Sequence, residues 1–126
     1  MPPSWESWAV ELQGRRVVVT HPQRLLWPAP AITKGQLVAY YLRVAGHLLP
    51  HLSGRPLVLV RCPDGVGGPT FYQKEIPSGA PPWVKTVPVR HGGRTVRYVL
   101  AEDAPTLAWL GQMAAVELHG WLSCVA

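Results

Sequence analysis

Residues 57–74, LVLVRCPDGVGGPTFYQK, contain the pattern from which the fold of this chain is best predicted. They open with four consecutive apolar residues, LVLV, a run typical of a strand that is covered on both faces. Two prolines, an aspartate and three glycines follow within residues 63–69. This density of turn formers before a second β-like run predicts a hairpin with an extended loop.

The second strand of this hairpin begins with the aromatic pair Phe71 and Tyr72. Because neighbouring strand residues point to opposite faces, one ring can enter the core while the other stays exposed, with Lys74 on the face of Tyr72. Bases stack on aromatic rings while Lys and Arg neutralise phosphates, so this arrangement suits a nucleic-acid end. The alternative is an ordinary core hairpin with a solvated edge.

The positive charge of the chain is concentrated in its centre. All 12 Lys and Arg residues lie within residues 15–97, which contain only two acids and therefore carry a formal charge of +10, while the two ends carry −5. Such a field favours a polyanionic partner over a neutral one. The length of 126 residues, with 48% hydrophobic residues, is that of one domain.

The sequence contains no run of about 18 apolar residues, which a membrane span would require. The N-terminal segment MPPSWESWAVEL carries acids and no cationic region, so a signal peptide is not predicted either. We therefore expect a cytoplasmic protein, associated with the nucleoid if its partner is DNA. Cys62 and Cys124 have no metal-ligand spacing and are expected to be reduced.

The first predicted strand is the run of three valines at residues 17–19, and residues 1–14 before it form a leader of unknown role. Prolines at positions 22, 28 and 30 exclude a long helix after this strand. Residues 23–32, QRLLWPAPAI, are therefore expected to form an ordered loop. Three apolar residues are expected to hold it in place: Leu25, Leu26 and Trp27.

A helix is predicted to begin after Thr33. Thr33 and Gln36 have the spacing of a capping box, and Ile32 and Leu37 have that of a hydrophobic staple. Pro50 is expected to end the helix, which would then cover residues 34–49. Its apolar stripe recurs at helical intervals: Leu37, Tyr41, Val44 and Leu48.

Lys34 would occupy the first position of this helix, where the helix macrodipole disfavours a cation. Free backbone N–H groups at a helix N-terminus form a cradle for phosphate, and a bound anion would compensate the charge of the lysine. Lys34 is therefore a candidate phosphate clamp, which Arg24 in the preceding loop would complete. The alternative is a solvated surface lysine.

Two more strands are predicted over residues 83–89 and 95–100, joined through a Gly-Gly turn flanked by cations. These cations either contact a nucleic-acid backbone or protect the edge of the sheet from pairing with another chain. The cations in question are Lys85, Arg90, Arg94 and Arg97.

A second helix is predicted over residues 104–115, with Asp103 as its N-cap. The strand predicted at residues 116–119 would enter the core with Glu117 and His119 on one face. This pair has the chemistry of metal ligands or of an acid and a base. Two ligands are too few for a closed metal site, however, and a His that is hydrogen-bonded to a neighbouring group is the more common outcome.

The order of sequence blocks over residues 17–123 closely resembles the N-terminal part of the polymerase domain of bacterial ATP-dependent DNA ligase D. These domains belong to the archaeo-eukaryotic primase superfamily and act in non-homologous end joining. The blocks that carry the resemblance are THPQRLLWP, ITKGQL, LLPHLSGRPLVLVRCPDG, FYQK, APPWVKTVPV and TLAWLGQMAAVELHGWLS. Together with the predicted elements, the resemblance implies an α+β fold with a mostly antiparallel sheet and two main helices, and a partial polymerase-like domain over residues 15–126.

The resemblance also implies roles for several cations. In the family, two lysines hold the 5′-phosphate of the downstream DNA strand, and they match Lys34 and Arg24, the second being a departure that keeps the charge. An Arg before the PDG turn and a Lys after the aromatic pair lie near the template and the phosphates in the family. They match Arg61 and Lys74.

The aromatic pair of the family packs on the DNA at the gap and matches Phe71 and Tyr72. The histidine of the family's Glu-x-His block lies beside the catalytic centre and the incoming nucleotide, and it matches His119.

Two departures from the family concern catalysis. Family members usually have Pro at the position of Gly120, and after the WLS block they continue into a strand whose Asp-x-Asp pair binds two divalent metals, Mn or Mg, that act with the nucleotide. The sequence ends at Ala126, before that block, and its two aspartates, Asp64 and Asp103, are far apart in the chain. Polymerase chemistry needs carboxylates that hold both cations. We therefore predict no complete catalytic site, no metal site and no polymerase activity for this chain alone, although the family is one of nucleotidyltransferases.

The function predicted from the sequence is the binding of DNA ends or gaps that carry a 5′-phosphate, with a Ku-like protein and a DNA ligase as further partners and no membrane. Three alternatives stay open. The chain is one piece of a split or frameshifted DNA or RNA primase-polymerase that is active only with its missing half, or it is a degenerate remnant that folds poorly because half of the parental core is missing. The third alternative is a protein-interaction module of the end-joining machinery.

Overall fold

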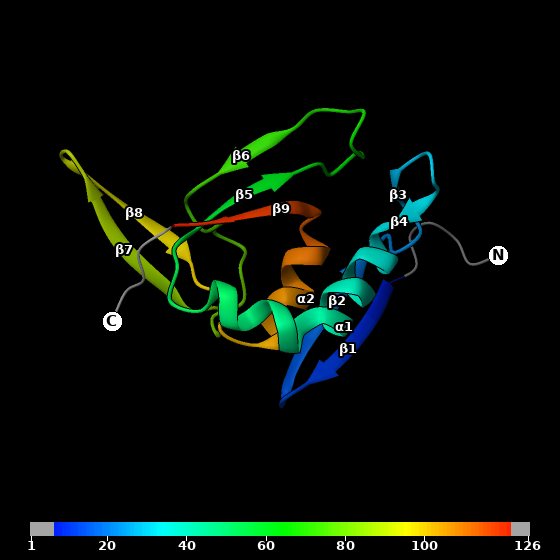
Figure 1. Ribbon diagram of the computed structural model, residues 1–126, viewed down its shortest axis with the longest axis horizontal. Coiled ribbons are helices and arrows are strands. Elements are labelled where there is room, and N and C mark those ends of the chain that lie inside the picture. The colour runs from blue at the N-terminus through cyan, green and yellow to red at the C-terminus, as the bar shows by residue number, and fades with distance from the viewer. Residues whose placement is uncertain (1–6, 122–126) are drawn as a thin grey trace.

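The computed structural model describes residues 7–121, which form a mostly antiparallel sheet with two helices on one side of it (Figure 1). The strands of the main sheet are β5 (Leu57–Arg61), β6 (Phe71–Gln73), β7 (Thr86–His91), β8 (Arg94–Val99) and β9 (Ala115–Gly120). β6 and β9 both pair with Leu59 and Val60, so they lie on opposite edges of β5. β8 pairs with β5 at Leu57, and β7 pairs with the other edge of β8. The α+β class predicted from the sequence is confirmed.

The helices are α1 (Lys34–Leu52) and α2 (Ala104–Gln112), and both differ in length from the prediction. Pro50 does not end α1, because it lies in the last turn and the bond from Ser53 N–H to the carbonyl of Leu49, at 2.8 Å, still closes that turn. α2 ends three residues early because Ala114 adopts a positive φ of 54° and turns the chain into β9.

The buried face of α1 is also shifted from the predicted stripe. Leu37 and Tyr41 are buried as expected, whereas Val44 and Leu48 are half-buried. The remaining core positions of the helix are Val38, Ala45 and Leu52. The face that α1 buries is set by α2, which packs beside the first half of the helix.

The N-terminal part of the described chain forms a hairpin of β1 (Ser7–Leu12) and β2 (Arg15–Thr20). The valine strand predicted at residues 17–19 lies within β2, and β1 lies within the leader to which the sequence assigned no role. The loop expected at residues 23–32 includes β3 (Leu25–Trp27), which pairs with β4 (Ile32–Thr33). Leu26 is fully buried and holds this loop against the core.

The β7–β8 hairpin is shifted relative to the predicted strands. It closes at Gly92 and Gly93, with His91 opposite Arg94. Gly92 has a φ of +62°, which glycine adopts without strain in a two-residue turn. Both strands therefore extend up to this turn, and β7 begins at Thr86, after the proline-rich segment.

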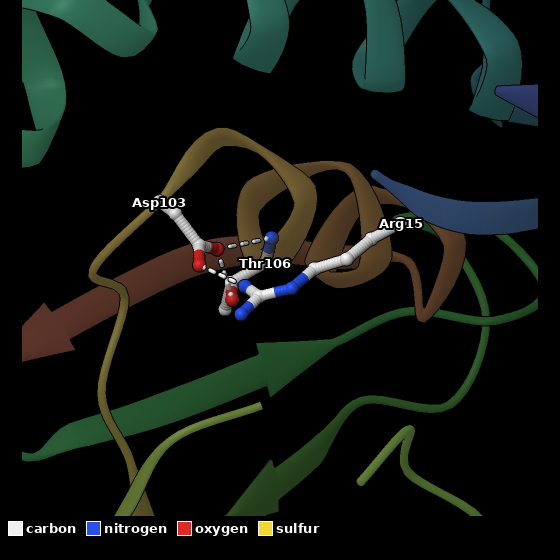
Figure 2. Close-up of polar contacts among 3 residues, drawn as sticks. All are labelled: Arg15, Asp103 and Thr106. Carbon is white, nitrogen blue, oxygen red and sulfur yellow. Dashed lines mark hydrogen bonds and ion pairs between the residues drawn. The ribbon is translucent and has the colours of Figure 1, made fainter. Parts of the chain in front are cut away.

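Asp103 is the N-cap of α2, as predicted, and also joins this helix to β2 (Figure 2). Its Oδ1 accepts hydrogen bonds from the backbone N–H of Thr106 at 3.0 Å and from the Thr106 hydroxyl at 2.7 Å, while its Oδ2 pairs with Arg15. Burial alone would raise the pKa of Asp103, but the hydrogen bonds from Thr106 and the contact with Arg15 lower it below its usual range. The Arg15 guanidinium also lies 5.3 Å from the ring centre of Trp83.

No helix within residues 7–121 is both long and apolar enough to cross a membrane.

Replacing Gly111 with Ala should lower the free energy of unfolding by about 1–3 kcal/mol, because overpacking at a close contact forces the backbone to shift. A Cβ at Gly111 would lie 2.8 Å from Cγ2 of Val38 and 3.1 Å from its Cα, which are atoms of α1. Urea-induced unfolding measures the change. Gly46→Ala in α1 is the matched control, since no atom lies within 4 Å of the added Cβ, and it should stabilise the protein by about 0.4–1 kcal/mol. Equal effects of the two substitutions would contradict a close crossing of α1 and α2 at Gly111.

Candidate nucleic-acid interface

Three of the cations singled out in the sequence line one cavity of about 220 Å³. Arg24 comes from the turn after β2, Lys34 from the first position of α1, and Arg61 from the end of β5. The remaining residues of the cavity wall are His21, Pro63, Gln112, Met113 and Ala114. Elements that are far apart in the sequence therefore bring three positive charges to one concave surface.

Lys34 is buried, with 7% of its surface exposed, so the interpretation as a solvated surface lysine is wrong. Its Nζ donates to the hydroxyl of Thr20 at 3.4 Å and to Oε1 of Gln112 at 3.3 Å. Burial, and then the nearby positive charge of Arg24, lower the pKa of Lys34 from 10.5 to about 8. Both acceptors are neutral and both bonds are long, so the charge of this ammonium is only partly compensated by the protein.

The backbone at the start of α1 does not form the free phosphate cradle that the sequence suggested. The N–H of Lys34 donates to the carbonyl of Arg24 at 2.9 Å, and the N–H of Gly35 donates to the carbonyl of Pro22 at 2.8 Å. The N–H of Gln36 donates to Oγ1 of Thr33 at 3.2 Å, which completes the predicted capping box. These donors are already used, so an anion in the cavity would meet the side chains of the cations and not these N–H groups.

The two arginines of the cavity are held in different ways. Nη1 of Arg24 donates to Oδ1 of Asp64 at 3.0 Å and to the carbonyl of Pro63 at 3.3 Å. Nε of Arg61 donates to the carbonyl of Met113 at 2.9 Å, and its Nη1 donates to Oε1 of Gln73 at 2.8 Å. Each guanidinium is thus fixed at the cavity wall while retaining further N–H donors.

Both rings of the aromatic pair are exposed, so the prediction that one would enter the core is wrong. Phe71 is 51% exposed and Tyr72 is 76% exposed. They lie on β6, a three-residue edge strand that Figure 1 shows away from the helices. Two large exposed rings on adjacent residues are costly in water unless a partner covers them.

Tyr72 and Lys74 line a second, more open cavity of about 630 Å³ together with His91 and Arg94 from the tip of the β7–β8 hairpin. The expectation that Lys74 shares the side of Tyr72 agrees with this. Of the four hairpin cations, Arg94 reaches this cavity, whereas Arg97 instead donates to Thr86 at 3.3 Å.

Lys34 and Tyr72 do not line the same cavity. The two cavities are linked through Arg61, which lines the first and donates to Gln73, a residue that lines the second. Arg61 also pairs in register with Phe71 across β5 and β6. Arg61 and Phe71 share one face of the sheet, whereas Tyr72 projects from the other face. The two regions therefore adjoin through β5 and β6 but do not form one surface.

Glu117 and His119 lie on an exposed face of β9 and bond to each other, with Oε1 of Glu117 and Nε2 of His119 2.9 Å apart. Glu117 and Tyr72 are both opposite Val60 in register, so they project from the same face of the sheet. Within residues 7–121 no three His, Cys, Asp or Glu side chains gather as metal ligands would. The described residues alone do not fit the two divalent cations that the family implies, and no metal-dependent step is assigned to them.

Sequence reasoning missed Thr20, Gln112 and His21. Gln112 accepts from the backbone N–H of Thr20 at 2.7 Å and donates to its hydroxyl at 2.8 Å, and the two together receive Lys34. The contacts of Gln112 with Thr20 and Lys34 span 92 and 78 residues of sequence, so no local pattern could reveal them. His21 lies at the cavity wall with a positive φ of 50°, a conformation that is uncommon outside glycine.

Replacing Lys34 with Met should stabilise the free protein at pH 7 by about 1–2 kcal/mol, because it removes a desolvated charge and keeps the length of the side chain. The pKa of Lys34 is lowered in the fold, so the folded protein binds fewer protons than the unfolded chain between pH 8 and 10.5, and the stability of the wild type should rise with pH in that window. Urea unfolding at pH 7 and pH 9.5 compares the two proteins. A wild type that is more stable than Lys34→Met at pH 7 would show that Lys34 is a structural contact.

The family of the LigD primase-polymerase domain matches residues 33–126 of this chain. The multifunctional non-homologous end joining DNA repair protein LigD of Mycobacterium tuberculosis is 39% identical over 105 residues, which are 83% of this chain and 14% of that protein. The LigD protein of Pseudomonas aeruginosa is 35% identical over 111 residues, which are 87% of this chain and 13% of that protein. The chain therefore spans about one seventh of the length of these curated relatives.

Among solved structures, the polymerase domain from M. tuberculosis ligase D in complex with DNA superposes with a TM-score of 0.81. It is 39% identical in sequence, and the match covers 83% of this chain and 37% of that one. The agreement extends from the sequence motifs to the arrangement of the sheet and helices. This chain belongs to the LigD primase-polymerase family.

Proposed function

We propose that this chain binds DNA ends or gaps through their 5′-phosphate. The proposal is based on the cavity in which Arg24, Lys34 and Arg61 converge, which we call the phosphate cavity. A terminal phosphate carries a charge of about −1.5 to −2 near neutral pH and three acceptor oxygens. An internal phosphodiester carries a single negative charge. A terminal phosphate therefore fits a small, cation-lined cavity better than an internal phosphodiester does.

The state of Lys34 supports this assignment. A buried ammonium with two long bonds to neutral oxygens is an incomplete arrangement, because desolvation of the charge is not offset by an anionic partner. An anion in the cavity would supply that partner and raise the pKa of Lys34 again. Arg24 and Arg61 would add the planar N–H pairs with which guanidinium groups bind phosphate.

The exposed rings supply the second part of the proposed interface. Phe71 and Tyr72 would stack on bases at the end or gap, while Lys74 would contact the backbone, as the resemblance to ligase D implies. The solved relative is a polymerase domain in complex with DNA, which supports a DNA partner for the same fold. His119 and Glu117 lie on the same face of the sheet as Tyr72 and would face the DNA strand that stacks on its ring.

A second candidate is that the chain acts as one piece of a larger polymerase domain. The match to the solved polymerase domain covers 37% of that chain, and residues 15–126 would then be its N-terminal part. In this case residues 15–126 would bind the DNA end, and a different polypeptide segment would supply the metal ligands for nucleotidyl transfer.

The Lys34→Met variant should lose most of the preference for a 5′-phosphate. We expect wild-type protein to bind a gapped duplex with a 5′-phosphate at least about tenfold more tightly than the same duplex with a 5′-hydroxyl, since a charge-assisted contact to phosphate contributes about 1.5–3 kcal/mol. In Lys34→Met the two duplexes should bind about equally. Fluorescence anisotropy at several salt concentrations measures both affinities and the salt slope.

Lys85→Ala is the matched control, because it also removes one lysine from the central segment but does not line the phosphate cavity. It should weaken binding to both duplexes by a similar factor. The proposed function would be contradicted if the wild type bound the two duplexes equally, or if both variants lowered the phosphate preference alike.

Replacing Tyr72 with Ala should weaken binding to gapped duplexes by about 1–3 kcal/mol, the range that removal of one base–aromatic stack produces. Tyr72→Phe should bind like the wild type, since it keeps the flat ring. The ratio of affinities for phosphate and hydroxyl ends should not change in either variant. If the phenylalanine variant lost as much affinity as the alanine variant, the hydroxyl group would be the contact and stacking would be ruled out.

A further inference from the structure

The three cations of the phosphate cavity differ in the charge of their protein partners. Lys34 bonds to a hydroxyl and a side-chain amide, and Arg61 bonds to a backbone carbonyl and a side-chain amide. Arg24 bonds to the carboxylate of Asp64, 3.0 Å from its Nη1. Within residues 7–121, Asp64 is thus the acid that forms an ion pair with a cation of this cavity.

The position of Asp64 is fixed by the backbone around it. The N–H of Gly65 donates to the carbonyl of Cys62 at 2.9 Å, and the N–H of Val66 donates to the carbonyl of Leu26 at 2.7 Å. Gly65 has a φ of +97°, and a Cβ there would lie 3.1 Å from the carbonyl oxygen of Leu25. The turn that carries Asp64 is therefore docked on β3, which begins directly after Arg24, while the two side chains of the ion pair are exposed.

We propose that Asp64 is an internal counterion that competes with the terminal phosphate for Arg24 and thereby limits the affinity of the cavity for phosphorylated ends. The inference rests on the proposed function of the cavity. A carboxylate and a phosphate are both oxyanions that accept from a guanidinium, so binding of the phosphate must weaken or share the contact with Asp64. The charge of Asp64 also repels a dianion about twice as strongly as a singly charged phosphodiester.

Asp64 could instead orient Arg24 toward the phosphate, and the two roles predict opposite effects. An Asn at this position keeps an oxygen that accepts from Nη1 and removes the negative charge. If Asp64 competes, this change increases the affinity for phosphate. If Asp64 orients Arg24 through its charge, the same change decreases it. Because Arg24 is also held by the carbonyl of Pro63, its place at the cavity wall does not depend on the carboxylate alone, which favours competition.

The Asp64→Asn variant tests the inference with the gapped duplexes described above and with inorganic phosphate. At low salt it should bind the 5′-phosphorylated duplex about threefold to tenfold more tightly than the wild type, and the 5′-hydroxyl duplex less than about threefold more tightly. The gain should shrink at 0.5 M salt, because exposed charges are screened. Inorganic phosphate should raise the melting temperature of the variant more than that of the wild type.

Glu11→Gln is the control, because it makes the same change in net charge on an exposed residue of β1 that pairs only weakly, at 3.9 Å, with Arg16. It should change both duplex affinities little and by the same factor. An unchanged or weaker affinity of Asp64→Asn for the phosphorylated duplex and for inorganic phosphate would overturn the counterion role. A wild type without preference for the phosphorylated duplex would instead refute the proposed function, and the phosphate titration would then decide the role of Asp64 by itself.

Discussion

The first turn of α1 is fixed to the chain that precedes it, and the candidate site depends on this constraint. The carbonyls of Pro22 and Arg24 accept the first two N–H groups of the helix, so helix and loop cannot move independently. Trp8 covers the same turn, and a Cβ at Gly35 would overlap its ring and lie 3.0 Å from the carbonyl oxygen of Pro22, so a larger residue there would displace Trp8. The side chains of Arg24 and Lys34 are consequently held at one place by backbone hydrogen bonds.

The same constraint forces a charged group into the interior. With α1 fixed, the side chain of Lys34 extends between β2 and the end of α2, where Thr20 and Gln112 receive it. Thr20 and Gln112 also bond to each other, so neither is left without a partner if the lysine is lost. The ammonium is therefore not needed to satisfy its neighbours, and its burial disfavours the fold. The desolvated charge of Lys34 thus offers no evident gain in folding free energy, which agrees with the binding role proposed for it.

The sequence predicted the parts of this structure that depend on local signals. The capping box at Thr33, the aspartate cap of α2 and the strand of β5 all follow from residues close in sequence, and the structure contains each of them. Local signals misjudged the end of α1, because a proline in the last turn of a helix removes few of its backbone hydrogen bonds. They also misjudged the exposure of the aromatic pair, because the alternation of strand residues does not tell whether a second layer covers an edge strand. The polar surroundings of Lys34 could not be predicted, since Gln112 reaches it across 78 residues.

The connection between β5 and β6 joins the two regions of the candidate interface. It begins at Arg61, which lines the cation-lined cavity, and it contains Asp64, which pairs with Arg24 of that cavity. It ends at the exposed ring of Phe71. Any shift of this connection must therefore change the charge around the cavity and the position of the rings together. Because its turn is docked on β3 and its two ends are paired in the sheet, such shifts are restricted. The relative positions of the cation-lined cavity and the two rings are accordingly fixed by the register of β5 and β6.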